Sequence, residues 1–391
     1  MGILFAALWV FCFVAVAVHL SSLALIVYRS RGCDPHPPQG GMPSVSILRP
    51  LCGIENSVTE TIESTFLLSF PKYEAVFCVS SSDDPVIELI KRLQSKYPNI
   101  ESRLLVGNDN ICSNPKLNNL AKGWRAALYG WIAMADSNVL LPPDYIDSMF
   151  ARWTADTGLV SSPPVGTQPE GFWAELECAY LNTYEARWQL LVDQIGFGFA
   201  QGKNMLCRRD LIDAAGGFAA LGTEAAEDAA ATKIIRRAGF RVRLSRMPFA
   251  QPLGRRNLLE VWHRQLRWAR LRRASFPLAF LPEVLSGSLF PLCAAMLLAL
   301  HVGASLAWVL ALAGIWYGTE LALARVVSWP CSVRSILTYI LRDLSLPVLW
   351  ICAWIGNGFV WRGNAMVATS GARGAVKAGS WSDFVFGSRA E

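Results

Sequence analysis

Residues 131–138 read Trp-Ile-Ala-Met-Ala-Asp-Ser-Asn, a short apolar run that ends directly in acidic and amide side chains. Such a run is typical of a buried strand, which places Asp136 and Asn138 at its carboxyl end. Similar apolar runs cover residues 45–48, 73–79 and 103–106, and the stretches 59–68, 85–96 and 117–129 have the character of helices. Strands that alternate with helices predict an α/β fold built on a mostly parallel sheet with helices on both faces.

The composition excludes an ordinary soluble enzyme. Hydrophobic residues make up 53% of the 391 residues and charged residues only 17%, whereas about 25% charged residues is usual in soluble domains. The net charge of +6 is mild, and the basic residues lie beside apolar segments, so we expect no nucleic-acid partner. The chain is therefore expected to be an integral membrane protein that carries a folded polar domain.

The apolar segments divide the chain into six parts. Residues 1–31 are expected to form an N-terminal transmembrane anchor, because residues 3–28 are almost wholly apolar and Arg29 and Arg31 follow directly. The positive-inside rule places these arginines, and the domain after them, in the cytoplasm. The other parts are a linker (32–42), the folded domain (43–256), an interfacial amphipathic helix (257–284), a C-terminal transmembrane region (285–361) and a tail (362–391).

The number of C-terminal crossings stays open. Residues 285–302, 305–327 and 344–361 are long and apolar enough to cross a membrane, and residues 335–341 have the pattern of an interfacial segment. Three crossings would put the tail outside, but the arginine and lysine residues of the tail favour the inside. One of these segments is therefore expected to be re-entrant or interfacial.

Polar residues follow several predicted strands, at the edge where parallel sheets bind ligands. Asp84 comes after residues 73–79, and its carboxylate can contact a nucleoside or cap a helix. Asp136 and Asn138 offer oxygen ligands for a hard cation, with phosphate oxygens completing its shell, or they form an Asx turn. Lys116 lies near a predicted helix N-terminus, where it can meet a phosphate or be solvated.

Two further motifs lie nearer the C-terminus. Asp228 follows Glu227 at the start of a predicted helix, where acids are common for dipole reasons, and it can also act as a general base. Arg264 and Arg267 share one face of the amphipathic helix and can clamp a diphosphate. Trp268 follows them and can stack on a sugar or lie at the bilayer surface. The simpler interpretation is a basic helix docked on anionic lipid headgroups.

The order of these motifs resembles the D, D, D, (Q/R)xxRW signature of inverting glycosyltransferases with the GT-A fold, and more narrowly the ceramide glucosyltransferase family. The matching stretches are Arg49-Pro-Leu-Cys-Gly-Ile-Glu55, Pro71-Lys-Tyr-Glu74, Asp83-Asp-Pro85, Asn114-Pro-Lys-Leu-Asn-Asn-Leu120, Asp136-Ser137, Ala226-Glu-Asp228 and Arg264-Gln-Leu-Arg-Trp-Ala-Arg-Leu-Arg272. The resemblance covers residues 43–282, and the compact, Ala- and Arg-rich chain is similar to bacterial relatives.

The resemblance implies a role for each motif. Asp228 would be the catalytic base, and the nucleotide-sugar would be bound by Asp84, Lys116, Asp136, Arg264, Arg267 and Trp268. Asp136 and Asn138 would hold Mg²⁺ or Mn²⁺. Two positions depart from the eukaryotic enzymes, which carry glycine in place of Asn138 and, near Glu185, a histidine implicated in donor or inhibitor binding.

The resemblance also implies an activity and a location. The chain is expected to transfer a hexose from a UDP-sugar to a lipid hydroxyl with inversion, as a ceramide β-glucosyltransferase does, at the cytoplasmic face of a bacterial inner membrane. The same chemistry on a hopanoid, with an N-acetylglucosamine donor, or processive transfer to diacylglycerol remains open. Polysaccharide synthases share the signature but usually need more spanning helices. A membrane scaffold or transporter with a degenerate transferase domain is the alternative from another class.

Overall fold

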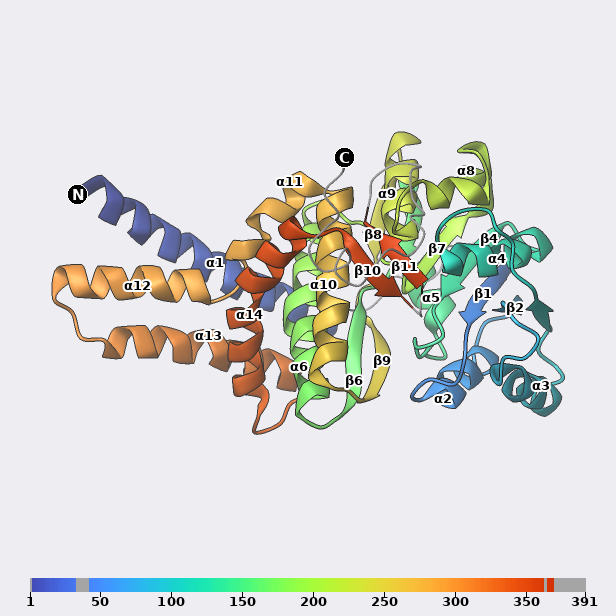
Figure 1. The fold of residues 1–391 in the computed structure, drawn as a ribbon, viewed down its shortest axis with the longest axis horizontal. Coiled ribbons are helices and arrows are strands. Elements are labelled where there is room, and N and C mark those ends of the chain that lie inside the picture. Colours follow the sequence, from blue (N-terminus) through green and yellow to red (C-terminus); the bar gives the residue numbers. More distant parts are fainter. Residues whose placement is uncertain (1, 33–41, 362–363, 369–391) are drawn as a thin grey trace.

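The structure is a computed structural model that describes residues 2–32, 42–361 and 364–368. It is elongated, with three helices that project from one end of a mixed α/β domain (Figure 1). The projecting helices are α1 (Gly2–Arg31), α12 (Leu289–Val302) and α13 (Ala307–Val326). Most of the predicted linker 32–42 and tail 362–391 lies outside the described residues.

A seven-stranded sheet forms the centre of the domain, in the order β3-β2-β1-β4-β7-β5-β8. Neighbours from β3 to β4 are parallel, as are β5 and β8, whereas β7 runs antiparallel to β4 and β5. The mostly parallel α/β fold predicted from the sequence is therefore confirmed. The strands are β1 (Val45–Leu51), β2 (Tyr73–Val79), β3 (Ser102–Val106), β4 (Trp131–Ala135), β5 (Thr157–Ser161), β7 (Asn204–Arg208) and β8 (Arg241–Leu244).

Helices cover both faces of this sheet because its strands are apolar on both sides. Every residue of β1 and β2 is buried, which is typical of parallel strands enclosed between helix layers. Leu117 and Leu120 of α4 pack with Ile132 and Met134 on one side. The helices that lie between the strands of this sheet along the chain include α2 (Val58–Glu63), α3 (Val86–Lys96), α4 (Pro115–Ala126), α5 (Tyr145–Phe150), α8 (Arg209–Ala214) and α9 (Glu227–Arg237).

Two helix predictions need correction at their ends. The expected helix 59–68 breaks after Glu63 into a short 3-10 turn, η1 (Ser64–Phe66). The expected helix 117–129 begins earlier, at Pro115, because the Asn114 side chain accepts the backbone N–H groups of Lys116 and Leu117. Such an N-cap, followed by proline in the first turn, fixes where a helix starts.

The strand register brings the polar loops to one edge of the sheet. Leu51 of β1 pairs with Val79 of β2, and Val79 pairs with Val106 of β3, so these strands end together. Met134 pairs with Leu48, which places the end of β4 beside them. The loops that follow β1, β2 and β4 therefore lie side by side.

A second, two-stranded sheet connects the domain to the projecting helices. Its parallel strands are β6 (Pro164–Glu170) and β9 (Phe249–Arg255). After β6 the chain forms α6 (Phe172–Tyr180), the π-helix η2 (Leu181–Ala186) and α7 (Arg187–Gln194). After β9 it forms α10 (Leu258–Ser275), which starts with a capping box between Asn257 and Glu260. The short α11 (Pro277–Phe280) and η4 (Leu281–Leu285) then lead to α12.

The structure corrects the prediction for residues 335–361. A single helix, α14 (Ser335–Ile355), replaces the interfacial segment 335–341 and the span 344–361, and the hairpin β10 (Gly358–Trp361) and β11 (Asn364–Val367) follows it. Three helices, α1, α13 and α14, are long and apolar enough to cross a membrane. The α12 helix reaches that length only together with residues Pro277–Leu285, at a bend of 45°.

The α14 helix lies across the base of the domain instead of projecting with α1, α12 and α13 (Figure 1). Just before its first residue, Ser332 Oγ donates to Glu175 Oε2 of α6 at 2.5 Å. In its middle, Arg342 Nη1 donates to Thr183 Oγ1 at 2.6 Å. At its end, Arg270 of α10 donates to the carbonyls of Cys352 and Gly358. Both ends of α14 therefore contact the same domain.

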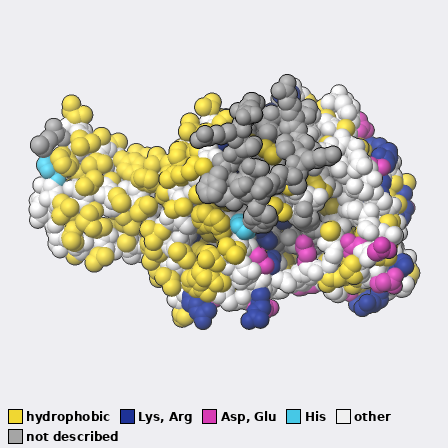
Figure 2. Space-filling model, viewed as in Figure 1, with side chains coloured by type: hydrophobic (Ala, Val, Ile, Leu, Met, Phe, Trp, Pro, Cys, Tyr) yellow, Lys and Arg dark blue, Asp and Glu magenta, His cyan; other side chains and the backbone are white. Residues whose placement is uncertain are grey.

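The outer face of α14 is apolar. Its exposed large side chains include Leu344, Val348, Ile351 and Ile355, which lie three, four or seven residues apart and so share one face of the helix. Hydrophobic side chains also cover the projecting helices, while acidic and basic ones gather at the opposite end of the molecule (Figure 2). An apolar surface of this extent on a folded domain marks contact with a membrane or a partner.

A buried ion cluster joins the projecting helices to the domain. Glu320 of α13 lies 3.0 Å from Arg342 Nη1 of α14 and 3.4 Å from Arg187 Nη1 of α7. His19 of α1 lies 2.9 Å from the same Arg187 nitrogen, and Asp343 pairs with Arg342 at 2.8 Å. All five side chains are at most 2% exposed. Because breaking a buried pair leaves an uncompensated charge, this cluster resists separation of the helices.

Candidate active site

Asp84 ties together the loops after β1 and β2. Its carboxylate accepts the backbone N–H of Gly53 at 2.9 and 3.1 Å and that of Val86 at 2.9 Å. Gly53 has φ +69°, a conformation that other residues rarely adopt. The bond to Val86 satisfies the first N–H of α3, although the N-cap position itself is Pro85 and not Asp84. The half-buried carboxylate also stands at the ligand-binding edge of the sheet.

Lys116 joins acidic groups from two distant segments. Its Nζ lies 2.6 Å from Asp136 Oδ1 and 2.6 Å from Glu227 Oε1, and it donates to the carbonyl of Gly202 at 2.5 Å. The Asn114 amide donates to the other oxygen of Glu227 at 3.0 Å. The lysine side chain is only 7% exposed, so the cluster holds its charges away from bulk water. The solvated role that the sequence allowed for Lys116 is therefore wrong.

The close approach of these groups needs glycine at position 202. A Cβ there would lie 2.6 Å from Glu227 Oε1 and 3.3 Å from Asp228 Oδ2. The N–H of Gly202 donates to Asp228 Oδ2 at 2.8 Å, and the N–H of Ala229 donates to Asp228 Oδ1 at 2.8 Å. The backbone therefore orients the Asp228 carboxylate at the first turn of α9.

Lys203 was missed by the sequence reasoning. Its Nζ lies 3.2 Å from Asp136 Oδ2 and donates to Asn138 Oδ1 at 3.0 Å. These are the two oxygens predicted to ligate a metal ion, and in the structure they converge on one positive charge. Within the described residues there is no group of three His, Cys, Asp or Glu side chains that could hold a metal. The pair fits a hard cation that keeps water and phosphate oxygens in its shell.

The pKa values of the two aspartates in this cluster, Asp136 and Asp228, are shifted in opposite directions. Desolvation alone would raise the pKa of Asp136, but the Lys116 and Lys203 ammonium groups outweigh it and lower the pKa to about 2. Desolvation, followed by the negative charge of Glu227, raises the pKa of Asp228 to about 6. Titratable groups whose environments push their pKa values apart are typical of acid–base sites. Asp136 remains a carboxylate at neutral pH, whereas Asp228 can exchange a proton there.

Arg264 approaches this cluster from α10. It forms an ion pair with Glu177 of α6, which also accepts from Arg256 Nε at 3.1 Å. Burial lowers the pKa of Lys203, and the positive charge of Arg264 lowers it further. Sequence reasoning did not single out Glu177, although an acid in the apolar stretch 172–180 was an available signal. It is fully buried and holds the arginine in place.

The other two residues of the motif on α10 contact aromatic and apolar side chains. Arg267 lies with its guanidinium carbon 5.8 Å from the ring centre of Trp361 in the C-terminal hairpin. Trp268 packs against Cys178, Leu181 and Leu253. The structure thus brings Asp136, Asn138, Lys116 and Asp228 together, with Arg264 close by, and leaves Arg267 and Trp268 in packing positions.

Arg49 positions the loop that carries Asp136. This fully buried side chain donates to the carbonyls of Asp136 at 2.9 Å and Val139 at 3.1 Å, and to Thr65 Oγ1 at 2.9 Å. Desolvation lowers its pKa to about 10, so it stays positive at neutral pH. It is the arginine of the matching stretch 49–55, which the sequence identified without assigning it a role.

The model of the family described as "Glycosyl transferase family 21" matches residues 7–373 of this chain. The chain belongs to glycosyl transferase family 21. Membership confirms the predicted resemblance and identifies the chain as a glycosyltransferase. In its candidate site Lys116 lies between Asp136 and Glu227. The match includes the apolar helices at both ends of the domain as well as the domain itself.

Curated relatives give the same assignment. Ceramide glucosyltransferase 3 of Caenorhabditis elegans is 29% identical over 91% of this chain and 79% of its own length. Ceramide glucosyltransferase 1 of the same organism is 28% identical over 68% of this chain but only 58% of its own length. Among solved structures, a mannosyltransferase of Pyrobaculum calidifontis aligns with 86% of this chain and 99% of its own, at 17% identity and a TM-score of 0.48.

Replacing Lys116 with methionine should destabilise the protein by about 3–5 kcal/mol, because the change removes the partner of two shielded carboxylates. The measurement is thermal unfolding in detergent. The matched control is Lys91→Met, since Lys91 forms an exposed pair with Glu88, and such pairs contribute about 0–1 kcal/mol. Equal melting temperatures for the two variants would show that the Lys116 cluster does not hold the site together.

Proposed function

We propose that this chain transfers a hexose from a UDP-sugar to the hydroxyl of a membrane lipid, with inversion at the anomeric carbon. The observation that carries the proposal is the environment of Asp228, a carboxylate with pKa raised to about 6 beside a cluster of lysines. The curated relatives act on ceramide by their names, and ceramide is the acceptor that we propose first. A hopanoid or a diacylglycerol acceptor is an outcome of the test below.

The donor is proposed to bind at the edge of the sheet where Asp84 and Asp136 stand. Asp84 would contact the nucleoside, and Lys203 and Arg264 bring positive charge to the diphosphate. Asp136 and Asn138 would hold Mg²⁺ or Mn²⁺ in the position that Lys203 Nζ now takes. A divalent cation bound there supplies neutralisation of the charge on the leaving diphosphate. Lys116, which the resemblance assigns to donor binding, would also keep Asp136 ionised for this role.

Asp228 is proposed to be the general base. Its carboxylate takes the proton of the lipid hydroxyl while the hydroxyl oxygen forms a bond to the anomeric carbon. The bond between that carbon and the diphosphate oxygen breaks, and the electron pair leaves with UDP. One displacement of this kind converts an α-linked donor into a β-linked product. Arg264, Arg267 and Trp268 would close over the donor and the acceptor. Arg264 would then interact with the donor as well as with Glu177, its partner in the structure.

The chain is proposed to lie in a bacterial inner membrane with the catalytic domain in the cytoplasm. α1 would cross once, and the α12–α13 hairpin would cross and return. α14 would lie in the interface, because both of its ends contact the domain and its outer face is apolar. This arrangement leaves the chain at Ala368 on the same side as the domain, in agreement with the basic tail. A scaffold or transporter would not need an ionised Asp136 and an Asp228 whose pKa is raised to about 6.

Expression in a bacterial host that lacks glycolipids, with each candidate lipid supplied, should yield a monohexosyl lipid detectable by mass spectrometry. The Asp228→Asn variant should lower kcat by about 10²–10⁴-fold, because it removes the base, while donor binding stays intact. The matched control is Asp210→Asn, since Asp210 is an exposed acid at the start of α8. Turnover by Asp228→Asn at the wild-type rate would exclude Asp228 as the base.

The activity should fall on the acidic side of pH 6. Only the carboxylate form of Asp228 can accept a proton, so below its pKa of about 6 kcat/KM should fall about tenfold per pH unit. In Glu227→Gln the neighbouring negative charge is gone, and the acidic limb should move to lower pH. The measurement is the pH profile of transfer in both proteins. A limb that stays in place would contradict the proposed coupling of the two acids.

The placement of α14 predicts which residues can be labelled from the cytoplasm. The background lacks Cys33 and the exposed cysteines among the described residues, at 52, 293 and 331. Single cysteines are then placed on either side of α14 by restoring Cys331 or by Asn357→Cys. Both should react with a membrane-impermeant maleimide in inverted vesicles and not in intact spheroplasts. Cys52 on the domain and Ser305→Cys, between α12 and α13, serve as controls for the two sides. Labelling of 331 and 357 from opposite sides would show that α14 crosses.

A further inference from the structure

The Lys203 side chain contacts both oxygens that the proposed function assigns to a metal ion. Its Nζ lies 3.2 Å from Asp136 Oδ2 and donates to Asn138 Oδ1 at 3.0 Å. The antiparallel pairing of β4 with β7 places Lys203 there, because Ala135 pairs with Asn204 and the backbone N–H of Asp136 donates to the carbonyl of Lys203 at 3.0 Å. A metal ion bound to the same two oxygens therefore competes with the Lys203 ammonium group for them.

The charge around Asp136 opposes a metal ion that arrives alone. Each oxygen of this single carboxylate already faces an ammonium group, Lys116 Nζ at 2.6 Å and Lys203 Nζ at 3.2 Å, and the Asn138 amide brings no charge. A divalent cation would meet two positive groups at short range, which is unfavourable. Mg²⁺ in nucleotide enzymes is usually bound through one or two carboxylates together with the phosphates of the substrate. The negative charge of a diphosphate would reverse the balance at this position.

Lys203 is the more weakly held of the two lysines. The Lys116 side chain is 7% exposed, and its Nζ contacts Asp136, Glu227 and the carbonyl of Gly202. The Lys203 side chain is 16% exposed, and the two contacts given above hold its Nζ. A lysine ammonium group stands on a flexible four-carbon stem, so it can change partners while the backbone stays in place. Lys203 is therefore the lysine that can leave Asp136.

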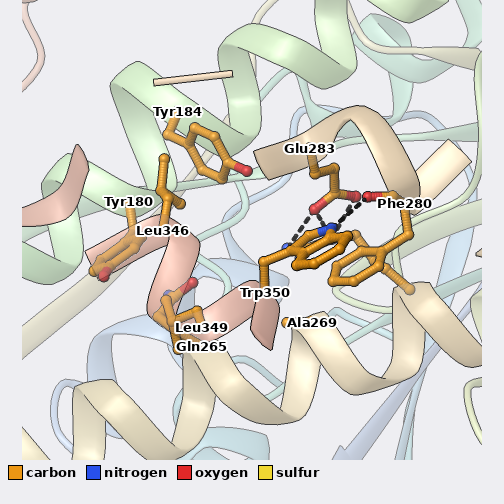
Figure 3. A pocket seen from close by; sticks show the side chains of 10 residues that line it. Tyr180, Tyr184, Gln265, Ala269, Phe280, Glu283, Leu346, Leu349 and Trp350 are labelled. Atoms are coloured by element: carbon orange, nitrogen blue, oxygen red, sulfur yellow. Dashed lines mark hydrogen bonds and ion pairs between the residues drawn. The ribbon is translucent and has the colours of Figure 1, made fainter. Parts of the chain in front are cut away.

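The arginine nearest to this site is held more firmly. Arg264 forms an ion pair with the fully buried Glu177. The next residue, Gln265, lies where α10 packs against Leu349 of α14, and the cavity between them has a volume of only about 20 Å³ (Figure 3), which is room for about one water molecule. Because α10 is closely packed on this side, the side chain of Lys203 is the cation that can respond to a bound donor.

We propose that Lys203 reserves the cation position until the donor binds. Without a donor its ammonium group occupies the oxygens of Asp136 and Asn138 and keeps a divalent ion out. When a diphosphate binds together with its metal ion, Lys203 leaves these oxygens, keeps its proton and pairs with a phosphate oxygen. The inference rests on the proposed function and adds to it the order of binding: the metal ion enters only with the diphosphate.

The first test is Mn²⁺ binding to the full-length protein in detergent, measured by the paramagnetic resonance signal of free Mn²⁺. Without nucleotide, Lys203→Met should bind Mn²⁺ at least about tenfold more tightly than wild type, because two charge-assisted hydrogen bonds no longer compete for the ligand oxygens. Lys203→Arg keeps the charge and should bind as weakly as wild type. UDP should tighten Mn²⁺ binding by wild type. Equal Mn²⁺ affinity of wild type and Lys203→Met without UDP would overturn the proposal.

Two further variants locate the effect. Adding Asp136→Asn to Lys203→Met should abolish the gain in Mn²⁺ affinity, and a gain that survived this change would place the ion elsewhere and overturn the proposal. The matched control is Lys233→Met, since Lys233 is another partly buried lysine with its own acid, Glu224, at 2.7 Å. This control should bind Mn²⁺ as wild type does. Tight Mn²⁺ binding by wild type without UDP would contradict the inference independently of every variant.

The second test measures UDP binding by calorimetry in the presence of EDTA. Lys203→Met should bind UDP about tenfold more weakly, which corresponds to 1.4 kcal/mol, because the diphosphate loses an ammonium partner. The factor by which UDP and Mn²⁺ strengthen each other is the same for both ligands, and it should be smaller in this variant. A merely structural role for Lys203 would weaken the binding of both ligands, and that result would overturn the proposal.

Neither test needs an acceptor lipid, so the two proposals can fail separately. If UDP did not promote Mn²⁺ binding by wild type, the role of Lys203 would be rejected, and a hexosyl lipid formed in the expression host would still support the proposed function. If no lipid were modified but Lys203→Met changed the two affinities in opposite directions, the proposed acceptor would be wrong and the role of Lys203 would stand.

Discussion

One ammonium group, Lys116 Nζ, stands between Asp136 and Glu227 at 2.6 Å from each, and the site depends on this arrangement. The two acids come from the end of β4 and the start of α9, and without a cation between them they would repel each other in a poorly hydrated space. The lysine keeps Asp136 charged. Desolvation and the charge of Glu227 nevertheless raise the pKa of Asp228, the residue after Glu227, to about 6, which suits the base role proposed for it.

The same constraint explains the glycine at position 202 and the asparagine at position 114. A side chain at position 202 would collide with Glu227, and Asn114 both starts α4 and donates to Glu227. Asn114 therefore has two roles, because it starts α4 and also holds the Glu227 carboxylate of the charged cluster. A site built into the first turns of helices is more rigid than one on free loops, because secondary structure fixes the backbone around it.

Much of this could be predicted from the sequence, and the limits have physical reasons. The strands 73–79 and 131–135 were predicted with the bounds that the structure gives, because uninterrupted apolar runs leave little choice of state. The partners of the site residues could not be predicted in this way. Lys203 and Glu177 act through contacts with segments distant in sequence, and no local periodicity reports such contacts.

The bounds of the last apolar helix were predicted wrongly, since the structure has one helix from Ser335 to Ile355, and this shows why composition alone is insufficient. Its hydropathy meets the criterion for a span, yet its buried face carries Arg342 and Asp343, which bind the domain and the helix α13. Its apolar residues lie on both faces: Leu346 and Leu349 are buried against the domain, while Leu344, Val348 and Ile351 are exposed. A window average cannot separate a helix that is apolar all round from one whose polar face is covered by protein.

The α10 helix connects the candidate site with α14. Arg264 reaches towards Lys203 and Glu177, while the next residue, Gln265, lines the cavity against α14. Because adjacent residues on one helix move together, any displacement of α10 changes the contacts of Arg264 with Glu177 and the packing against α14 at once. Its first turn is fixed by a capping box and its last turn by the contacts of Arg270 and Arg273 with the chain after α14. The hairpin that follows α14 therefore helps to set the position of Arg264 beside Glu177, because the helix that joins them is held at both ends.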